Sequence, residues 1–444
     1  MKQFLQKMIP GMNRLAPHLV IGLISVFYLI GIRSVPFHPD EATHIYMSRD
    51  VELFLSSPLD LAWNSDTPVT PAMRYRLIDA PMTRYLVGLG RLVFNLSPLS
   101  ADWDWSSSWS ENQQNGAMPS DQLLWVARAS NAILFPFTLY LMYQSGTLLA
   151  GSLGGWLAIA LSAGNALLLL HTRRAMSESA LFFFTCYIIY ASLKWERRKW
   201  LLGFLLALAV SSKHSAIAML PLIISAILVD NSINKQTWRN KLLQLLGTGM
   251  AFLAAFAFLN PVFWQHPVKA LLTSSSLRTD LSTRQVQEIG LIAPQLTLVN
   301  PGERIVAAIV QSFYAPPAIS DVGNYINAQQ ESTIRYLSNP IHNIGRDWIS
   351  GSLGLIFLIS GLAMAMRSLW ANTPRPWHIL FLLISFLGCL LFYLIFIPLA
   401  FQRYVILLFP SGILLIDYAI VTLVARLHSR STKKSGAISK NRTG

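Results

Sequence analysis

Long apolar stretches with almost no charge are the feature that most restricts how this chain can fold. A helix needs about 20 apolar residues to cross a hydrocarbon core, and about ten stretches approach this length. Backbone polar groups inside lipid must be bonded within the segment, so the spans have to be helices. We therefore predict an all-α polytopic membrane protein with transmembrane helices at 17–35, 122–144, 147–170, 178–193, 200–212, 214–230, 243–259, 349–367, 377–397 and 403–425.

The composition agrees with a membrane protein. The chain has 53% hydrophobic and 13% charged residues, whereas a soluble domain has roughly 25% charged residues. Both cysteines, Cys186 and Cys389, lie inside apolar stretches, where they are expected to act as small hydrophobic residues. The sequence contains no metal-ligand spacing, phosphate loop or glycine-rich dinucleotide motif.

The net charge of +14 is distributed as membrane topology requires, and we expect no nucleic-acid partner. Short cytoplasmic loops are enriched in Lys and Arg. With the N-terminus inside, the cytoplasmic segments contain Lys2, Lys7, Arg14, Lys194, Arg197, Arg198, Lys199, Lys235, Arg239, Lys241, Arg367, Arg375, Arg426, Arg430, Lys433, Lys434, Lys440 and Arg442. The sequence thus predicts a multi-pass protein of the cell membrane with both termini in the cytoplasm.

Two long segments, 36–121 and 260–348, then face outward. Trp103 and Trp105 near the tip of the first favour an interfacial belt, although sugar stacking uses the same residue type. In the second, Glu303–Tyr314 places apolar residues on one helical face, which predicts an amphipathic helix on the membrane surface. We expect one domain over 1–426 and a disordered basic cytoplasmic tail over 427–444.

An acidic pair, Asp40 and Glu41, follows the first span closely, at the depth where lipid phosphates lie. One interpretation is structural, with Asp40 opening a helix as its N-cap. The other is functional, because acids at this depth can act on a lipid-linked substrate.

Cations in the short outward turns favour the functional interpretation. These turns contain Arg173 with Arg174, Lys213 with His214, and Arg403. Each cation alone is explained by snorkelling, but several at one face need an anionic partner. Glu178 could be part of that partner, or could only stabilise the positive end of its helix.

At these residues the sequence resembles the GT-C superfamily of polyprenyl-phosphate-sugar-dependent glycosyltransferases. The nearest branches are the protein O-mannosyltransferase, lipid A aminoarabinose transferase and rhizobial lipopolysaccharide glycosyltransferase families. The resemblance covers most of the chain, and its strongest element is His38-Pro39-Asp40-Glu41-Ala42 after the first helix.

The resemblance implies a role for each matching residue. Asp40 corresponds to the catalytic base, with Glu41 beside it and Glu178 as a further acid. Ala80 stands where the family has a basic residue, so Arg84 is the candidate that compensates. The residues expected to bind substrate are His38, Asp79, Arg84, Arg173, Arg174, Lys213, His214, Arg403 and Tyr404.

The implied reaction transfers a hexose or pentose from a polyprenyl-phosphate carrier to a hydroxyl of a lipid, glycan or protein acceptor. It would occur at the outer membrane face, with inversion at the anomeric carbon, and membrane lipids would surround the enzyme. No cofactor is certain, and a divalent metal is possible.

Two other functions remain open. A transporter or lipid flippase also uses charge within the membrane, but places it near the midplane and often has two related halves, which we do not find. A non-catalytic subunit would not need its acids. The enzyme hypothesis requires Asp40 to lie within about 15 Å of Arg403 and Lys213, the reach of one shared phosphosugar.

Overall fold

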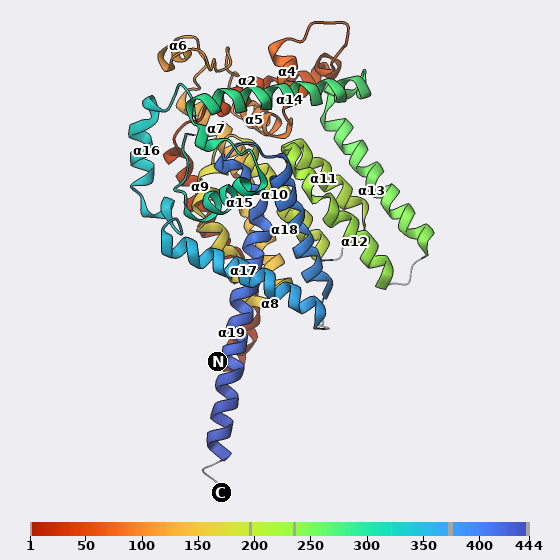
Figure 1. Ribbon diagram of the computed structural model, residues 1–444, viewed down its shortest axis with the longest axis vertical. Coiled ribbons are helices and arrows are strands. Elements are labelled where there is room, and N and C mark those ends of the chain that lie inside the picture. The colour runs from red at the N-terminus through yellow and green to blue at the C-terminus, as the bar shows by residue number, and fades with distance from the viewer. Residues whose placement is uncertain (1, 195–197, 234–236, 321, 372–375, 441–444) are drawn as a thin grey trace.

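The computed structural model is a helical bundle with a cap of further helices at one end (Figure 1). It describes residues 2–194, 198–233, 237–320, 322–371 and 376–440; of residues 2–14, 230–233 and 430–440 only the backbone is described. Over the described residues, no segment forms a named β-strand. The predicted all-α membrane fold is confirmed.

The bundle helices follow the predicted spans. They are α1 (Lys2–Ile30), α7 (Asp121–Ala132), α8 (Leu134–Ala163), α10 (Ser177–Leu193), α11 (Trp200–Ser212), α12 (Leu220–Ile233), α13 (Trp238–Leu259), α17 (Trp348–Trp370), α18 (Pro376–Phe396) and α19 (Phe409–Lys440). Within the described residues, six segments are long and apolar enough to cross a membrane, and three apolar helices are shorter. The count of about ten spans stays a prediction.

The boundary between the second and third predicted spans is wrong in position. It was expected at 145–146, but α8 continues to a kink at Ala150 and Gly151, where Gly151 has φ +76°. The two halves of α8 pack closely at glycines, since a Cβ on Gly146 would lie 2.5 Å from the Gly154 carbonyl oxygen. A short turn between small residues leaves little signal in hydropathy, and α9 (Ala166–His171) completes the return.

Both long loops fold into helices at the end of the molecule opposite the two chain ends (Figure 1). The first loop forms α2 (Pro39–Tyr46), α3 (Asp50–Ser56), α4 (Pro71–Ile78), α5 (Met82–Val93) and α6 (Trp109–Gln114), and the second forms α14 (Pro267–Ile292), α15 (Pro301–Ile309) and α16 (Gln330–Leu337). We call this the loop end. The helix predicted from Glu303 is present as α15, continued by a π-helical turn over Val310–Tyr314.

Burial within the bundle is uneven, as a lipid environment requires. Most residues of α10 are buried at the centre. In contrast, only 6% of the apolar window of α13 is buried, and Met250 is 70% exposed. Because water would penalise such an apolar surface, α13 faces lipid.

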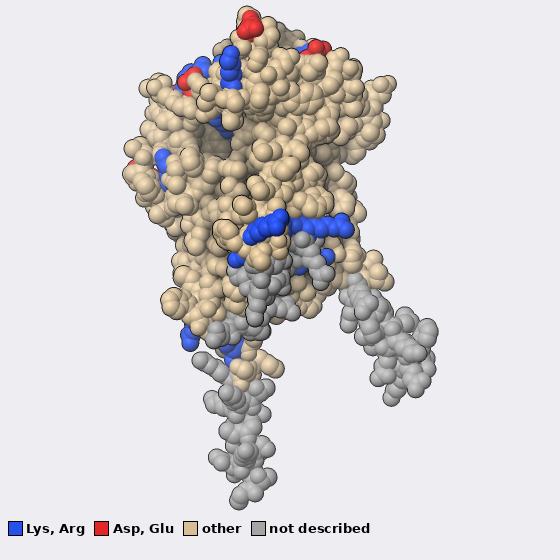
Figure 2. All heavy atoms as spheres, turned by 90° about the vertical axis from the view of Figure 1, so that its right-hand side faces the viewer, with Lys and Arg blue, Asp and Glu red and all other residues tan. Residues whose placement is uncertain are grey.

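The visible acids gather at one end of the molecule. On the face shown in Figure 2, Asp and Glu lie near the top together with some Lys and Arg, and a band of Lys and Arg without acids crosses the molecule further down. The cytoplasmic assignment rests partly on Arg197, Lys235, Arg375 and Arg442, which lie outside the described residues. The backbone of α19 is helical as far as Lys440. The disorder expected for the tail over 427–444 stays a prediction, and residues 441–444 lie outside the described part.

Candidate active site

A cavity of about 830 Å³ lies between the loop helices and the bundle. Its volume is within the range of ligand-binding pockets, roughly 300–1,000 Å³. Residues from both long loops, the start of α10, the turn after α11 and the segment before α19 line it. Segments far apart in the sequence therefore converge on one space.

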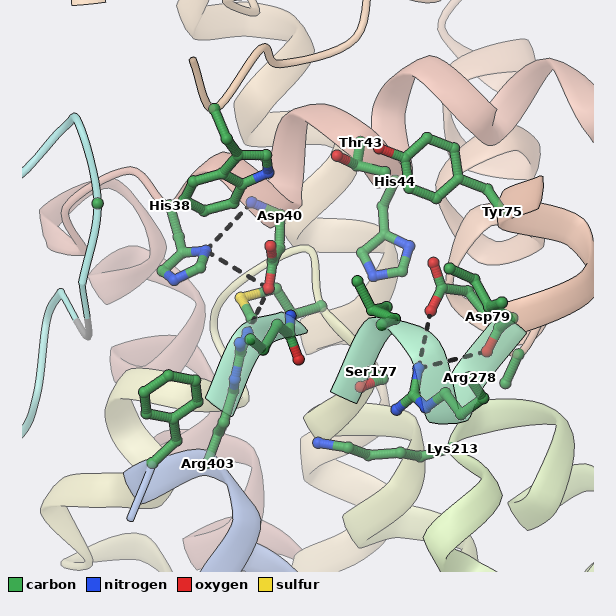
Figure 3. A pocket seen from close by; sticks show the side chains of 18 of the residues that line it. His38, Asp40, Thr43, His44, Tyr75, Asp79, Ser177, Lys213, Arg278 and Arg403 are labelled. Carbon is green, nitrogen blue, oxygen red and sulfur yellow. Dashed lines mark hydrogen bonds and ion pairs between the residues drawn. The ribbon is translucent and has the colours of Figure 1, made fainter. Parts of the chain in front are cut away.

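Asp40 is positioned by the first turn of α2. Pro39 starts the helix, His38 Nδ1 accepts the Asp40 backbone N–H at 3.1 Å, and the Glu41 carboxylate accepts the His38 N–H at 3.0 Å. This reciprocal capping fixes the chain direction. The Asp40 carboxylate points into the cavity, where it is 30% exposed and pairs with Arg403 (Figure 3).

The charges around Asp40 set its protonation state. Burial opposes ionisation, but the positive charge of Arg403 outweighs it and holds the pKa of Asp40 well below its usual range. Burial lowers the pKa of His38 to about 3, so this ring is neutral. Asp40 is therefore an anion matched by one guanidinium group, with an uncharged imidazole 3.8 Å away.

A second ion pair forms the bundle side of the cavity. Lys213 Nζ lies 2.7 Å from Glu178 Oε1. Lys213 Nζ and Arg403 Cζ both lie over the ring of Tyr404, at 5.2 and 5.8 Å from its centre. Asp40, Glu178, Lys213 and Arg403 therefore line one cavity.

A third pair, which the sequence did not predict, joins the two long loops. Arg278 of α14 lies 3.5 Å from Asp79, and Ser274 of the same helix donates to the Leu77 carbonyl oxygen at 2.6 Å. His44, Tyr75 and His214 line this part of the cavity. Figure 3 shows Asp79 and Arg278 on one side and Asp40 with Arg403 on the other. No local pattern in α14 marks Arg278, because its partner lies in the other loop.

Four of the expected site residues do not line the cavity. Glu41, Arg84, Arg173 and Arg174 are each less than 6% exposed. Arg84 pairs with Asp50 at 3.2 Å. Arg173 Nε donates to the Tyr28 carbonyl oxygen at 3.0 Å, and Arg174 Nη2 donates to that of Ile319 at 2.7 Å.

Glu41 is enclosed by donors, and its main partner was missed. Arg128 of α7 donates to both carboxylate oxygens at 2.7 Å, and the Ala175 N–H donates at 2.9 Å. Arg128 is the only charged residue of the predicted span 122–144. A lone charge within a span implies a buried partner, so a signal for Arg128 was available.

Three of the four acids that line the cavity are already paired with cations, and a divalent metal there stays a prediction. Asp40, Asp79 and Glu178 each face a cation at ion-pair distance. Among the residues that the structure describes, no group of three or more His, Cys, Asp or Glu is placed to hold a metal ion. A hard divalent cation needs several oxygen ligands that are not already neutralised.

Solved structures share this arrangement of helices. No protein-family model matches the sequence, and comparison with curated proteins finds no match. The archaeal oligosaccharyltransferase AglB from Archaeoglobus fulgidus, in complex with an inhibitory peptide and a dolichol-phosphate, aligns with a TM-score of 0.51 and 11% identity over 96% of this chain and 52% of AglB. The chain has the GT-C fold.

Two further structures of GT-C superfamily glycosyltransferases align along most of the chain. The apo form of the Archaeoglobus fulgidus oligosaccharyltransferase gives a TM-score of 0.50 and 12% identity, covering 95% of this chain and 52% of that one. ArnT from Cupriavidus metallidurans bound to undecaprenyl phosphate gives 0.45 and 13%, covering 91% and 60%. The chain therefore spans about half the length of the oligosaccharyltransferase.

Proposed function

We propose that the protein is a membrane glycosyltransferase that moves a sugar from a polyprenyl-phosphate carrier to an acceptor hydroxyl. The observation that carries the proposal is the Asp40 carboxylate, ionised and open to a cavity that also contains the cations Arg403 and Lys213. The GT-C fold supports it, and AglB, which has this fold, is described in complex with a dolichol-phosphate.

Asp40 acts as the base. The acceptor oxygen attacks the anomeric carbon, the bond from that carbon to the phosphate oxygen breaks with its electron pair going to the phosphate, and Asp40 takes the acceptor proton. Attack opposite the leaving group inverts the configuration. A positioned base contributes about 10²- to 10⁴-fold.

The ion pair with Arg403 explains how a weakly basic carboxylate becomes active. Although burial raises the pKa of Asp40, the neighbouring Arg403 holds it low. A donor phosphate beside Arg403 takes up part of its positive charge, so the pKa of Asp40 rises when the donor binds. The base is thereby strengthened only when a substrate is present.

Lys213 and Arg403 stabilise the phosphate as it leaves. Preorganised cations in a site that excludes water stabilise the developing negative charge, by about 3 kcal/mol for each donor. Glu178 holds Lys213 at 2.7 Å in the resting site and is proposed to orient it toward the phosphate. His38 and Tyr404 pack beside these groups, and Asp79 and His214 line the space for the sugar.

The four expected residues outside the cavity are proposed to support it. Glu41 and Arg128 fix the start of α2, and Arg84 joins α5 to Asp50. Arg173 and Arg174 tie the turn before α10 to backbone carbonyl groups of other segments. The cavity is proposed to open at the outer membrane face, with both chain ends in the cytoplasm.

Changing Asp40 to Asn tests the proposal. Mass spectrometry of envelope glycans and lipids, with and without the gene, identifies the product. We expect the wild-type gene and the control Asp60→Asn, an exposed acid of the same loop, to restore that product, and Asp40→Asn to give none although the protein is inserted normally. Full restoration by Asp40→Asn would reject Asp40 as the base.

A flippase predicts a different result. It would change the side of the membrane on which a lipid-linked sugar is found, without changing the amount of glycosylated product. Measuring the sidedness of the lipid-linked sugar in the same strains separates the two functions.

A further inference from the structure

Trp105, at the tip of the first loop, is a half-exposed aromatic residue on the wall of the cavity. Its neighbours Trp103 and Trp109 contact each other and Phe37, and Trp103 is 2% exposed. Trp105 is 45% exposed and lines the cavity. The interfacial belt expected for this segment therefore does not describe Trp103, and Trp105 faces the cavity.

The turn that carries Trp105 is held firmly. The Asp104 carboxylate accepts the Ser106 N–H at 2.8 Å and the hydroxyl groups of Ser106 and Ser107 at 2.7 and 2.8 Å. From the second loop, Asn324 donates to the carbonyl oxygens of Asp104 and Ser107 and accepts from Trp103 Nε1 at 3.2 Å. These bonds fix the backbone on both sides of an exposed indole.

Aromatic rings lead from Trp105 to the base. The Trp105 ring centre lies 6.1 Å from that of Tyr325, and Tyr325 lies 5.4 Å from His38, both edge to face. His38 in turn lies 3.8 Å from the Asp40 carboxylate. Gly323, at φ +148°, makes room for this stack, because a Cβ there would lie 3.0 Å from both Trp105 and Tyr325.

An exposed, rigid indole beside a polar cavity has the chemistry of a sugar platform. A pyranose ring has an apolar C–H face that packs on an aromatic ring, while its hydroxyl groups at the edge remain free to hydrogen-bond. Aromatic residues with few rotatable bonds provide such contact area at low entropic cost. A buried core residue would not be left 45% exposed.

We propose that Trp105 binds a pyranose ring of the acceptor, so that the acceptor is a glycan or a glycolipid rather than a protein side chain. This rests on the proposed function. The donor phosphate is assigned to Lys213 and Arg403 on the bundle side of the cavity, and the donor's prenyl chain keeps it there. Trp105 belongs to the loop that folds at the other side, so it meets the molecule that enters from the loop end (Figure 1).

Saturation-transfer NMR on the full chain in detergent micelles tests sugar binding directly. The probes are methyl β-D-glucopyranoside, methyl β-D-galactopyranoside and methyl α-D-mannopyranoside, with a serine tripeptide for comparison. We expect at least one glycoside to receive saturation on one ring face with the wild type, Trp105→Phe and Asp40→Asn, and none with Trp105→Ala. The control Trp370→Ala removes a tryptophan that is 90% exposed on α17 and should behave as wild type.

Kinetics with the acceptor fraction from the gene-deletion strain tests the assignment to the acceptor. Loss of one aromatic stacking contact costs up to about 1.5 kcal/mol, so Trp105→Ala should raise the acceptor KM about tenfold and change kcat little. Trp105→Phe should stay within about threefold of wild type.

Three results would overturn the inference: equal glycoside binding by wild type and Trp105→Ala, saturation of the tripeptide alone, or a higher KM for the donor instead of the acceptor. None of these affects the Asp40→Asn result, which decides the proposed function separately. Trp105→Phe keeps the test valid if Trp105→Ala does not fold.

Discussion

Changing Glu41 to Gln should cost mainly stability, whereas the neighbouring change of Asp40 to Asn should cost mainly activity. The two acids are adjacent in the sequence but differ in surroundings. Glu41 is fully buried, whereas Asp40 is 30% exposed to the cavity. Substitution of each acid by its amide therefore separates support of the site from chemistry in it.

The magnitude follows from the four hydrogen bonds that Glu41 accepts. Oε1 accepts from Arg128 Nε and the Ala175 N–H, and Oε2 accepts from Arg128 Nη2 and the His38 N–H. An amide has one oxygen, so either orientation points an NH₂ group at two donors. Each buried donor left without an acceptor costs about 1–3 kcal/mol, and breaking a buried ion pair costs about 3–5 kcal/mol.

We expect Glu41→Gln to lower the free energy of unfolding by about 3–5 kcal/mol. Unfolding of the purified protein in mixed detergent micelles, followed by circular dichroism, measures this loss. Asp40→Asn is the matched comparison and should lose clearly less stability, because Asp40 is 30% exposed and its ion pair with Arg403 faces the cavity. The double variant Glu41→Gln with Arg128→Met should recover part of the loss, because it removes the uncompensated buried charge.

A stable Glu41→Gln protein that has lost transfer would contradict this reasoning. In that case Glu41 would act on the substrate, as the family resemblance alone suggested, and its four hydrogen bonds would not define its role.

Two further predictions concern charge and packing. Although burial raises the pKa of Asp40, Arg403 holds it well below its usual range. Arg403→Met should therefore raise the pKa of Asp40, and the acid limb of the pH profile of kcat/KM should move to higher pH. An unshifted limb would show that Asp40 is not the titrating base. In α11, a Cβ on Gly203 would lie 1.9 Å from the Thr248 carbonyl oxygen, whereas one on Gly247 would meet nothing within 4 Å. Gly203→Ala should destabilise the protein by about 1–3 kcal/mol while Gly247→Ala should not, as thermal unfolding in detergent can show; equal melting temperatures would mean that α11 and α13 do not pack this closely.

Several residues of the site can be recognised from the sequence alone. Asp40, Glu178, Lys213 and Arg403 stand out because charge next to an apolar span is costly and needs a reason. All four line the cavity. The same argument applied within a span would have identified Arg128.

Other features depend on which side chains meet. Arg84 and Arg174 looked equivalent to Arg403 in the sequence, yet they are buried against Asp50 and the Ile319 carbonyl oxygen. Arg278 lies in a polar stretch of the second loop with no marker of its own, and only the position of α14 across the loop end brings it to Asp79 (Figure 1).

Hydropathy and charge, read along the chain, determined the helical membrane fold and the rim at which acids and cations gather, because transfer between water and lipid depends on each residue's own chemistry. The choice of partner for each charge was decided only by tertiary structure. An ion pair needs atoms within about 4 Å, and the distance between residues such as Asp40 and Arg403 is set by the packing of helices that the sequence separates widely.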